Sequence, residues 1–277
     1  MNRIVVLFGI ILSISSGLYA QTYSEWIESS FHYLDENRLD SAEIALKNAL
    51  RTEPDNPLNA FLFQNLGTLL RRQGKNREAL EFYTLALRRY PQNATILSDR
   101  ASLNAETGDF ISALIDYNTL LEQEPDNEEA LYQRGLLNLK IKKLEQSEID
   151  FQKMLEINPA SLYARLGLAS LYIVTGKLNE AETVYYYIEG KVKETEILSK
   201  IYAGRAEIYL LKEKGGRALT EINKAIHEEP ENPYFYIIRS RAKLLLHEKQ
   251  PAAEDIRKAI DLGYDVKDAE ALLQLTK

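Results

Sequence analysis

A spacing of about 34 residues recurs along this chain and constrains its fold more than any other feature. Pro91, Pro125 and Pro159 follow one another at intervals of 34 residues, and Pro54 and Pro230 fall into the same register once short insertions are allowed. The insertions are three residues long, at 57–59 and 196–198. A period of this length indicates small structural units that bury their apolar surface by stacking on one another.

The register divides most of the chain into seven units. These are residues 23–56, 60–93, 94–127, 128–161, 162–195, 199–232 and 233–266, followed by a terminal segment, 267–277. In residues 60–93, apolar residues recur at helical spacing on both sides of Gly74. Gly74 is expected to take the left-handed conformation that ends a helix, and Pro91 to stop the second helical run. Each unit therefore predicts two short helices.

Three positions of the repeat carry a consistent pattern of side-chain size. The eighth position holds Ser30, Gly67, Ala101, Gly135, Ala169, Ala206 and Ser240. The twentieth holds Ala42, Ala79, Ala113, Ser147, Ala181, Ala218 and Ala252. The twenty-fourth holds Leu46, Tyr83, Tyr117, Phe151, Tyr185, Ile222 and Ile256. Small residues facing large ones indicate closely packed helix pairs.

This pattern resembles the tetratricopeptide repeat family over residues 23–266. The first unit matches the family pattern at Trp26, Tyr33, Ala42, Ala49 and Pro54. The resemblance implies an all-α fold, a right-handed α-solenoid of about seven helix–turn–helix repeats. Residues 267–277 are expected to form a C-terminal capping helix.

Some positions depart from the family pattern. Asn104 and Asn138 stand at the eleventh position, where an aromatic residue is expected, and Met154 replaces the second alanine of its unit. The fifth unit lacks its closing proline and is followed by an insertion, with Gly190 just before it. We therefore predict that residues 190–198 form either a soft seam, a weakly stable boundary between two units, or a helix extended by one turn.

Residues 1–20 carry the features of an export signal. Arg3 is followed by an apolar run over residues 4–12, and small and polar residues lead to a predicted cleavage site after Ala20. An uncleaved anchor is the alternative, although the run is short for a membrane-spanning helix. The protein is therefore expected to be periplasmic or secreted, with no integral membrane segment after cleavage. The absence of cysteine excludes disulfides.

Composition and motifs argue against several function classes. The formal net charge of −7 disfavours nucleic acid as a partner. The sequence contains no phosphate-binding loop and no Gly-x-Ser-x-Gly elbow, and its three histidines are isolated from one another. We therefore expect no enzyme activity, no cofactor and no metal site.

The resemblance also indicates where a ligand would bind. In this family the concave groove is lined by the first helix of each unit, mainly by its second, fifth and ninth positions. The corresponding residues here are Phe61, Gln64, Glu129, Tyr132, Tyr163, Leu166, Ser170, Lys200, Glu207, Tyr234, Ile237 and Arg241. The carboxylate clamp of chaperone-binding relatives is absent, because Ile27, Gln64 and Ser98 occupy the fifth positions of the first three units. The alternative is that the aromatic residues only pack between neighbouring first helices.

Two functions remain open from the sequence. The first is a non-enzymatic scaffold of the cell envelope that binds a protein or peptide on its concave face. The second is an accessory or regulatory subunit of an envelope enzyme or transport complex. The sequence names neither the partner nor the oligomeric state.

Overall fold

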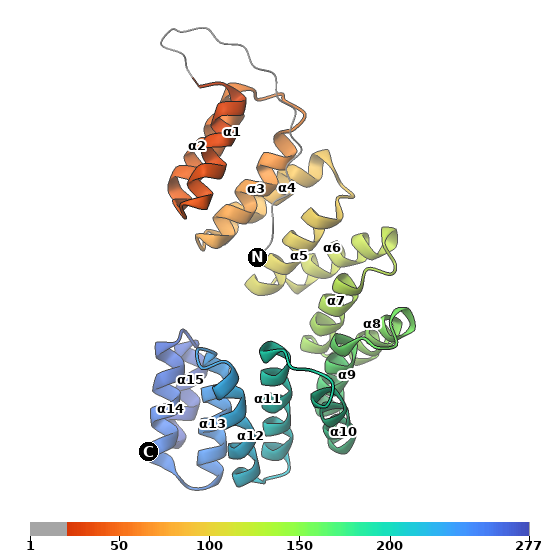
Figure 1. Ribbon diagram of the computed structural model, residues 1–277, viewed down its shortest axis with the longest axis vertical. Helices are drawn as coiled ribbons and strands as arrows, with labels where there is room; N and C mark the ends of the chain where they lie inside the picture. The colour runs from red at the N-terminus through yellow and green to blue at the C-terminus, as the bar shows by residue number, and fades with distance from the viewer. Residues whose placement is uncertain (1–20, 277) are drawn as a thin grey trace. The chain divides into compact units, whose positions relative to one another are not determined.

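The computed structural model describes residues 21–276, and within them the chain forms fifteen α-helices and no strand (Figure 1). The first helices of the repeats are α1 (Tyr23–Asp35), α3 (Asn59–Arg72), α5 (Ala94–Thr107), α7 (Glu128–Lys140), α9 (Leu162–Val174), α11 (Thr195–Leu211) and α13 (Pro233–Leu245). The second helices are α2 (Leu39–Thr52), α4 (Asn76–Arg89), α6 (Phe110–Gln123), α8 (Leu144–Ile157), α10 (Leu178–Glu189), α12 (Gly215–Glu228) and α14 (Lys249–Asp261). The predicted all-α helical repeat fold is confirmed.

The chain separates into two compact units. The N-terminal unit ends at Thr107 and contains α1 to α5, and the C-terminal unit begins at Gly108 and contains α6 to α15. The division falls inside the predicted repeat 94–127. The predicted export signal, residues 1–20, lies outside the described residues.

The turn within each helix pair has the same backbone geometry in all seven repeats. Its fifteenth position takes a positive φ, 75° at Gly74, as the sequence predicts. Four repeats place a residue other than glycine there, namely Asn37, Lys142, Glu213 and His247, with φ between 55° and 64°. Backbone bonds such as Lys75 N to Leu70 O (2.9 Å) close the turn. The turn geometry is therefore maintained even where the residue type does not favour it.

The last position of a repeat begins the next first helix. The side chains of Asn93, Asn127 and Ser161 accept hydrogen bonds from the backbone N–H three residues later, at 3.1, 2.9 and 3.3 Å. These bonds satisfy N–H groups that have no partner within the helix. They explain why α5, α7 and α9 each begin directly after the turn.

Contacts between glycine and aromatic side chains set the distance between helices. A Cβ atom at Gly67 would lie 2.7 Å from the Tyr83 ring, and one at Gly135 would lie 2.6 Å from Cε1 of Phe151. The other side of the Phe151 ring faces Gly167 of the next repeat, where a Cβ would also overlap it. Phe151 is fully buried and is enclosed by α7 and α9 together. The predicted contact between small and large residues therefore occurs both between the two helices of one repeat and between neighbouring repeats.

The insertion after the fifth repeat lengthens a helix. Residues 196–198 form part of the first turn of α11, which has 17 residues. Residues 190–194 are a short non-helical link in which Val192 is buried, in one cluster with Ile188 and Ile197. Of the two predictions for this segment, the helix extended by one turn describes α11.

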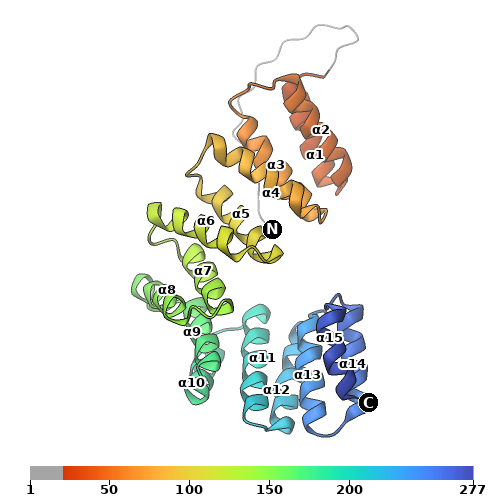
Figure 2. The same ribbon diagram turned by 180° about the vertical axis from the view of Figure 1, so that it is seen from behind.

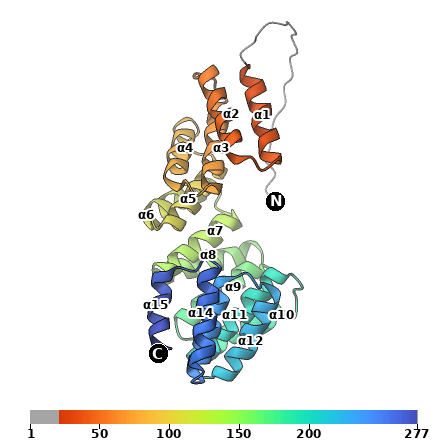
Figure 3. The ribbon, with the colours of Figure 1, turned by 90° about the vertical axis from the view of Figure 1, so that its left-hand side faces the viewer.

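At the end of the chain, α15 (Val266–Leu275) lies beside α14 (Figure 3) and also packs against α13. The side chain of Asp265 accepts from the backbone N–H groups of Lys267 and Asp268 and begins the helix. Ala269 is its fully buried residue. Among the described residues, no helix combines the length and the apolar character needed to cross a bilayer.

The enclosure of Phe151 yields a test of this packing. We expect Gly135→Ala to lower the free energy of unfolding by about 1–3 kcal/mol, because the ring cannot move away from α7 without striking α9. Gly216→Ala is the matched control, since a Cβ at Gly216 meets nothing within 4 Å, and it should be neutral or slightly stabilising. Urea unfolding followed by circular dichroism measures both. Equal effects of the two substitutions would contradict the packing argument.

Candidate protein-binding face

Within the C-terminal unit, residues of neighbouring first helices contact one another on one face. We call this surface the first-helix face and define it by Glu129, Tyr132, Tyr163, Lys200, Glu207, Tyr234 and Arg241. Tyr132 of α7 and Tyr163 of α9 meet edge to face, with 5.4 Å between ring centroids. The Lys200 ammonium of α11 lies 5.7 Å from the Tyr163 centroid. The structure therefore brings these three predicted residues together across three repeats.

A second contact on this face joins α11 and α13. The Tyr234 hydroxyl donates a hydrogen bond to Oε1 of Glu207 at 2.5 Å. Arg241 is exposed two turns further along α13. Tyr163 and Tyr234 retain 40% and 43% of their surface, although each has a neighbour from the next or preceding repeat. Packing between neighbouring first helices, the alternative role of these aromatic residues, therefore buries only part of the surface of each tyrosine.

Burial controls the ionisation of two of these tyrosines. It raises the pKa of Tyr132 to about 12, with smaller contributions from Tyr163 and nearby carboxylates. Burial and the Glu207 carboxylate also raise the pKa of Tyr234 well above its ordinary value. Both hydroxyls are therefore neutral at physiological pH and can donate or accept hydrogen bonds.

Not all of the predicted residues face solvent. Leu166 and Ile237 are 5% and 4% exposed and belong to hydrophobic clusters of the core. Ser170 is half-buried and donates to the backbone oxygen of Leu166 at 3.1 Å. The resemblance to the family assigned these side chains to the groove, but in this chain the core takes up Leu166 and Ile237, and Ser170 bonds to its own helix. They are removed from the candidate binding surface.

The two predicted residues of the N-terminal unit lie on α3. Phe61 is 46% exposed and its ring centroid lies 5.7 Å from that of Tyr90. Gln64 donates to Oδ2 of Asp99 on α5 at 3.2 Å. Burial raises the pKa of the Asp99 carboxyl. This unit therefore presents an aromatic residue beside a polar pair, and it is considered separately from the first-helix face.

An ion pair that recurs within the C-terminal unit was missed from the sequence. Four repeats carry arginine at the seventh position and an acidic residue at the twenty-third: Arg100 and Asp116, Arg134 and Asp150, Arg205 and Glu221, and Arg239 and Asp255. The other three repeats have uncharged residues at both positions. This joint occurrence of arginine and acid in the sequence was a signal that could have predicted the pairs.

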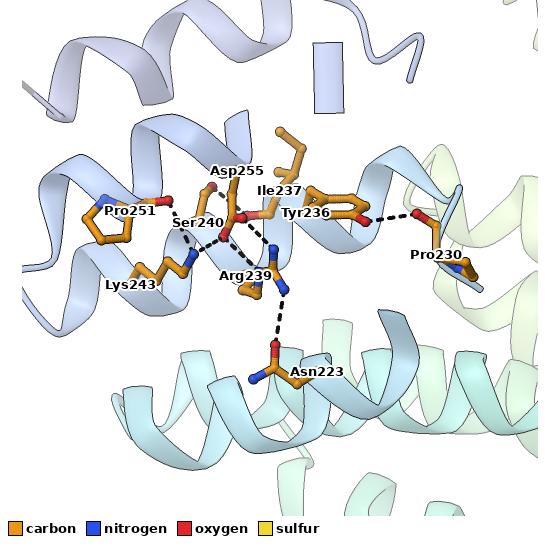
Figure 4. Close-up of polar contacts among 9 residues, drawn as sticks. All are labelled: Asn223, Pro230, Tyr236, Ile237, Arg239, Ser240, Lys243, Pro251 and Asp255. Carbon is orange, nitrogen blue, oxygen red and sulfur yellow. Dashed lines mark hydrogen bonds and ion pairs between the residues drawn. The ribbon is translucent and has the colours of Figure 1, made fainter. Parts of the chain in front are cut away.

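Three of the four repeats that lie wholly in the C-terminal unit carry the arginine, and in each of them it links three helices. Arg239 binds both oxygens of Asp255 at 2.9 and 2.6 Å and donates to Asn223 of the preceding second helix at 3.2 Å (Figure 4). Arg134 makes the same three contacts with Asp150 and Asn118. A bidentate guanidinium–carboxylate pair fixes both distance and orientation. The buried carboxylates of these pairs have a structural role, whereas the asparagines are exposed.

The same ion pairs explain departures from the family pattern. Asn138 at the eleventh position donates to Oδ2 of Asp150 at 3.3 Å, and Lys243 at that position of the last repeat lies 2.7 Å from Oδ2 of Asp255. A buried carboxylate needs such additional donors. In these two repeats a polar residue therefore replaces the aromatic one, whereas the repeat with Glu221 keeps Tyr209 at the eleventh position.

No group of three or more histidine, aspartate or glutamate side chains placed to hold a metal ion occurs in residues 21–276. The geometry described above can bind another chain through aromatic surface and opposite charges.

Comparison with known proteins agrees with this architecture. Family models described as tetratricopeptide repeat match residues 32–94 and 64–119, and residues 128–161. The crystal structure of a tetratricopeptide repeat protein from Parabacteroides merdae ATCC 43184 is 43% identical, aligns over 93% of this chain and 99% of that chain, and has a TM-score of 0.87. This chain belongs to the tetratricopeptide repeat family.

More distant structures share the fold alone. A tetratricopeptide repeat protein of Thermus thermophilus is 21% identical over 67% of this chain and 99% of its own, with a TM-score of 0.57. Yeast Tom70 is 14% identical over 97% of this chain and 66% of its own, with a TM-score of 0.58. The tetratricopeptide repeat fold is consistent with a protein-interaction scaffold, and members of the family are generally non-catalytic.

The paired arginines of this repeat protein yield a quantitative test. We expect Asp150→Val alone to cost about 3 kcal/mol of unfolding free energy or more, because it leaves the largely buried Arg134 without its carboxylate. The double variant Arg134→Leu/Asp150→Val copies Leu168 and Val184, which occupy these positions in the next repeat, and should cost much less. Urea unfolding of both variants gives the comparison. A double variant less stable than the single variant would contradict it.

Proposed function

We propose that this protein is a non-enzymatic scaffold that binds an extended or helical segment of a partner protein on its first-helix face. The observation that carries the proposal is the partial exposure of Tyr163 on α9 and Tyr234 on α13, two first helices of one compact unit. Aromatic side chains held rigid by their neighbours lose little entropy on binding and are common energetic centres of interfaces.

The charges on the first-helix face support a selective interaction. Lys200 is paired with Glu196 at 2.7 Å, and both are exposed. Arg241 and Glu129 place a further charge of each sign on the same face. A mixed polar surface around exposed rings resembles the polar rim and aromatic centre of transient interfaces. A partner segment with apolar residues flanked by charges of both signs would match it.

The second candidate is an accessory or regulatory subunit of an envelope enzyme or transport complex. A repeat array can serve this role with the same face, since binding one partner and organising several use the same contacts. Purification from the envelope fraction separates the two. A stable stoichiometric membrane complex supports the accessory subunit, and weak binding to many segments supports the general scaffold.

Binding on the first-helix face can be tested with the tyrosines. We expect the triple variant Tyr132→Ala, Tyr163→Ala and Tyr234→Ala to weaken partner binding by at least tenfold, because each substitution removes the contact of one aromatic ring with the partner. Photo-crosslinking from position 163, followed by mass spectrometry, identifies the partner, and calorimetry measures the affinity. Circular dichroism checks that helicity is retained.

Ile111→Ala with Tyr187→Ala serves as the control. Both residues are exposed on second helices, at 75% and 47%. This control should leave the affinity unchanged. Unaltered binding by the triple variant with intact helicity would place the partner elsewhere.

We further propose that the protein is exported by residues 1–20. The charged start, the short apolar run and the small residues up to Ala20 support this proposal. Intact mass spectrometry of the protein from its native cells should give a chain beginning at Gln21, and the protein should be released with the periplasmic or secreted fraction. An uncleaved chain that stays with the membrane would favour the anchor instead.

A further inference from the structure

The second helices α6 and α8 of the C-terminal unit border a groove of about 760 Å³, which we call the α6–α8 groove. α7 packs against both helices (Figure 2). It contributes Leu131 and Arg134 to the lining of the groove. α6 contributes Asn118 and Glu122. The lining shares no residue with the first-helix face, so the groove is a separate surface.

The α8 wall has a regular composition. Glu145, Ile149, Gln152 and Glu156 follow one another at intervals of three or four residues, so they lie on one side of the helix. Ile149 lines the groove and is 58% exposed. An exposed aliphatic side chain is thus placed between carboxylates of the same helix.

The groove carries an excess of negative charge. The carboxylates of Glu122, Glu145, Glu148 and Glu156 line it, are exposed, and form no ion pair with any residue of the described chain. The basic residues of the lining are already neutralised, Arg134 by Asp150 at 2.6 Å and Lys153 by Asp126 at 3.1 Å. An adjoining hollow that shares Ile149 is also lined by Lys143. Apart from that end, the lining carries four carboxylates outside ion pairs, against two cationic side chains that are already paired.

We propose that the α6–α8 groove is a second docking site, and that it binds a basic amphipathic helix of a partner protein. One or two aliphatic side chains of that helix cover Ile149, and its lysine or arginine residues pair with Glu145, Glu148 and Glu156. Charge complementarity selects this occupant, because an acidic or phosphate-bearing ligand would be repelled. The protein can then hold two partners at once, one in the groove and one on the first-helix face.

A fluorescein-labelled 14-residue helical peptide of lysine and leucine, with leucine at spacings of three and four, provides the probe. Fluorescence anisotropy with the purified protein measures its affinity. We expect Glu145→Gln/Glu148→Gln/Glu156→Gln to weaken binding by about tenfold, since each exposed ion pair contributes a small share. Ile149→Ala should weaken it by a further few-fold, and salt should weaken binding to the unmodified protein more than to the triple variant.

A matched control separates the groove from the general acidity of the chain. Glu180→Gln/Glu254→Gln/Glu270→Gln removes the same number of charges from exposed glutamates of α10, α14 and α15. This control should change the affinity by less than twofold, and Tyr163→Ala/Tyr234→Ala should leave it unchanged. An equal loss in the control and groove variants would overturn the proposal.

The absence of cysteine permits a direct positional readout. A Gln152→Cys variant carrying a paramagnetic label should broaden the NMR resonances of the bound peptide, whereas the label at Glu254→Cys should not. Sedimentation of the unlabelled protein tests the competing occupant. A homodimer that Ile149→Asp dissociates would show that a second copy fills the groove, and would also overturn the proposal.

Discussion

The close approach of a glycine to an aromatic ring is the contact on which the rest of this structure depends. Phe151 is held between Gly135 of its own repeat and Gly167 of the next, so one side chain sets the spacing of three helices. Because the interior is closely packed, a methyl group added at this contact would disturb the packing of all three helices. The spacing of the first helices, and hence of Tyr132 and Tyr163 on their outer face, follows from this contact.

The arginine–carboxylate pairs add orientation to that spacing. A buried ion pair contributes little net stability, but its fixed geometry restricts how two helices can turn against each other. Arg134 and Arg239 each join their own repeat to the preceding second helix through an asparagine. Because Arg134 is occupied in this way, it does not neutralise the exposed glutamates of α8. The same residue that stabilises the stack therefore leaves the α6–α8 groove acidic.

The C-terminal unit thus presents two surfaces of different chemistry. The first-helix face offers tyrosine rings with charges of both signs, and the α6–α8 groove offers one isoleucine among carboxylates. Different chemistry on the two sides of one stack allows different partners to be selected independently. A repeat protein suits this arrangement, because its first helices form one surface of the stack and its second helices form another.

The amino-acid sequence by itself determined the helical repeat fold, because the columns around Gly67, Ala79 and Tyr83 repeat every 34 residues and only stacked helix pairs satisfy them. It also contained the arginine and acid columns, although their meaning depends on which helices meet. Tertiary structure alone decided which groove positions remain exposed. Leu166 and Tyr163 both stand at groove positions of α9, yet Leu166 is buried and Tyr163 is partly exposed. Their burial depends on how the neighbouring repeats pack, which the sequence of one repeat does not give.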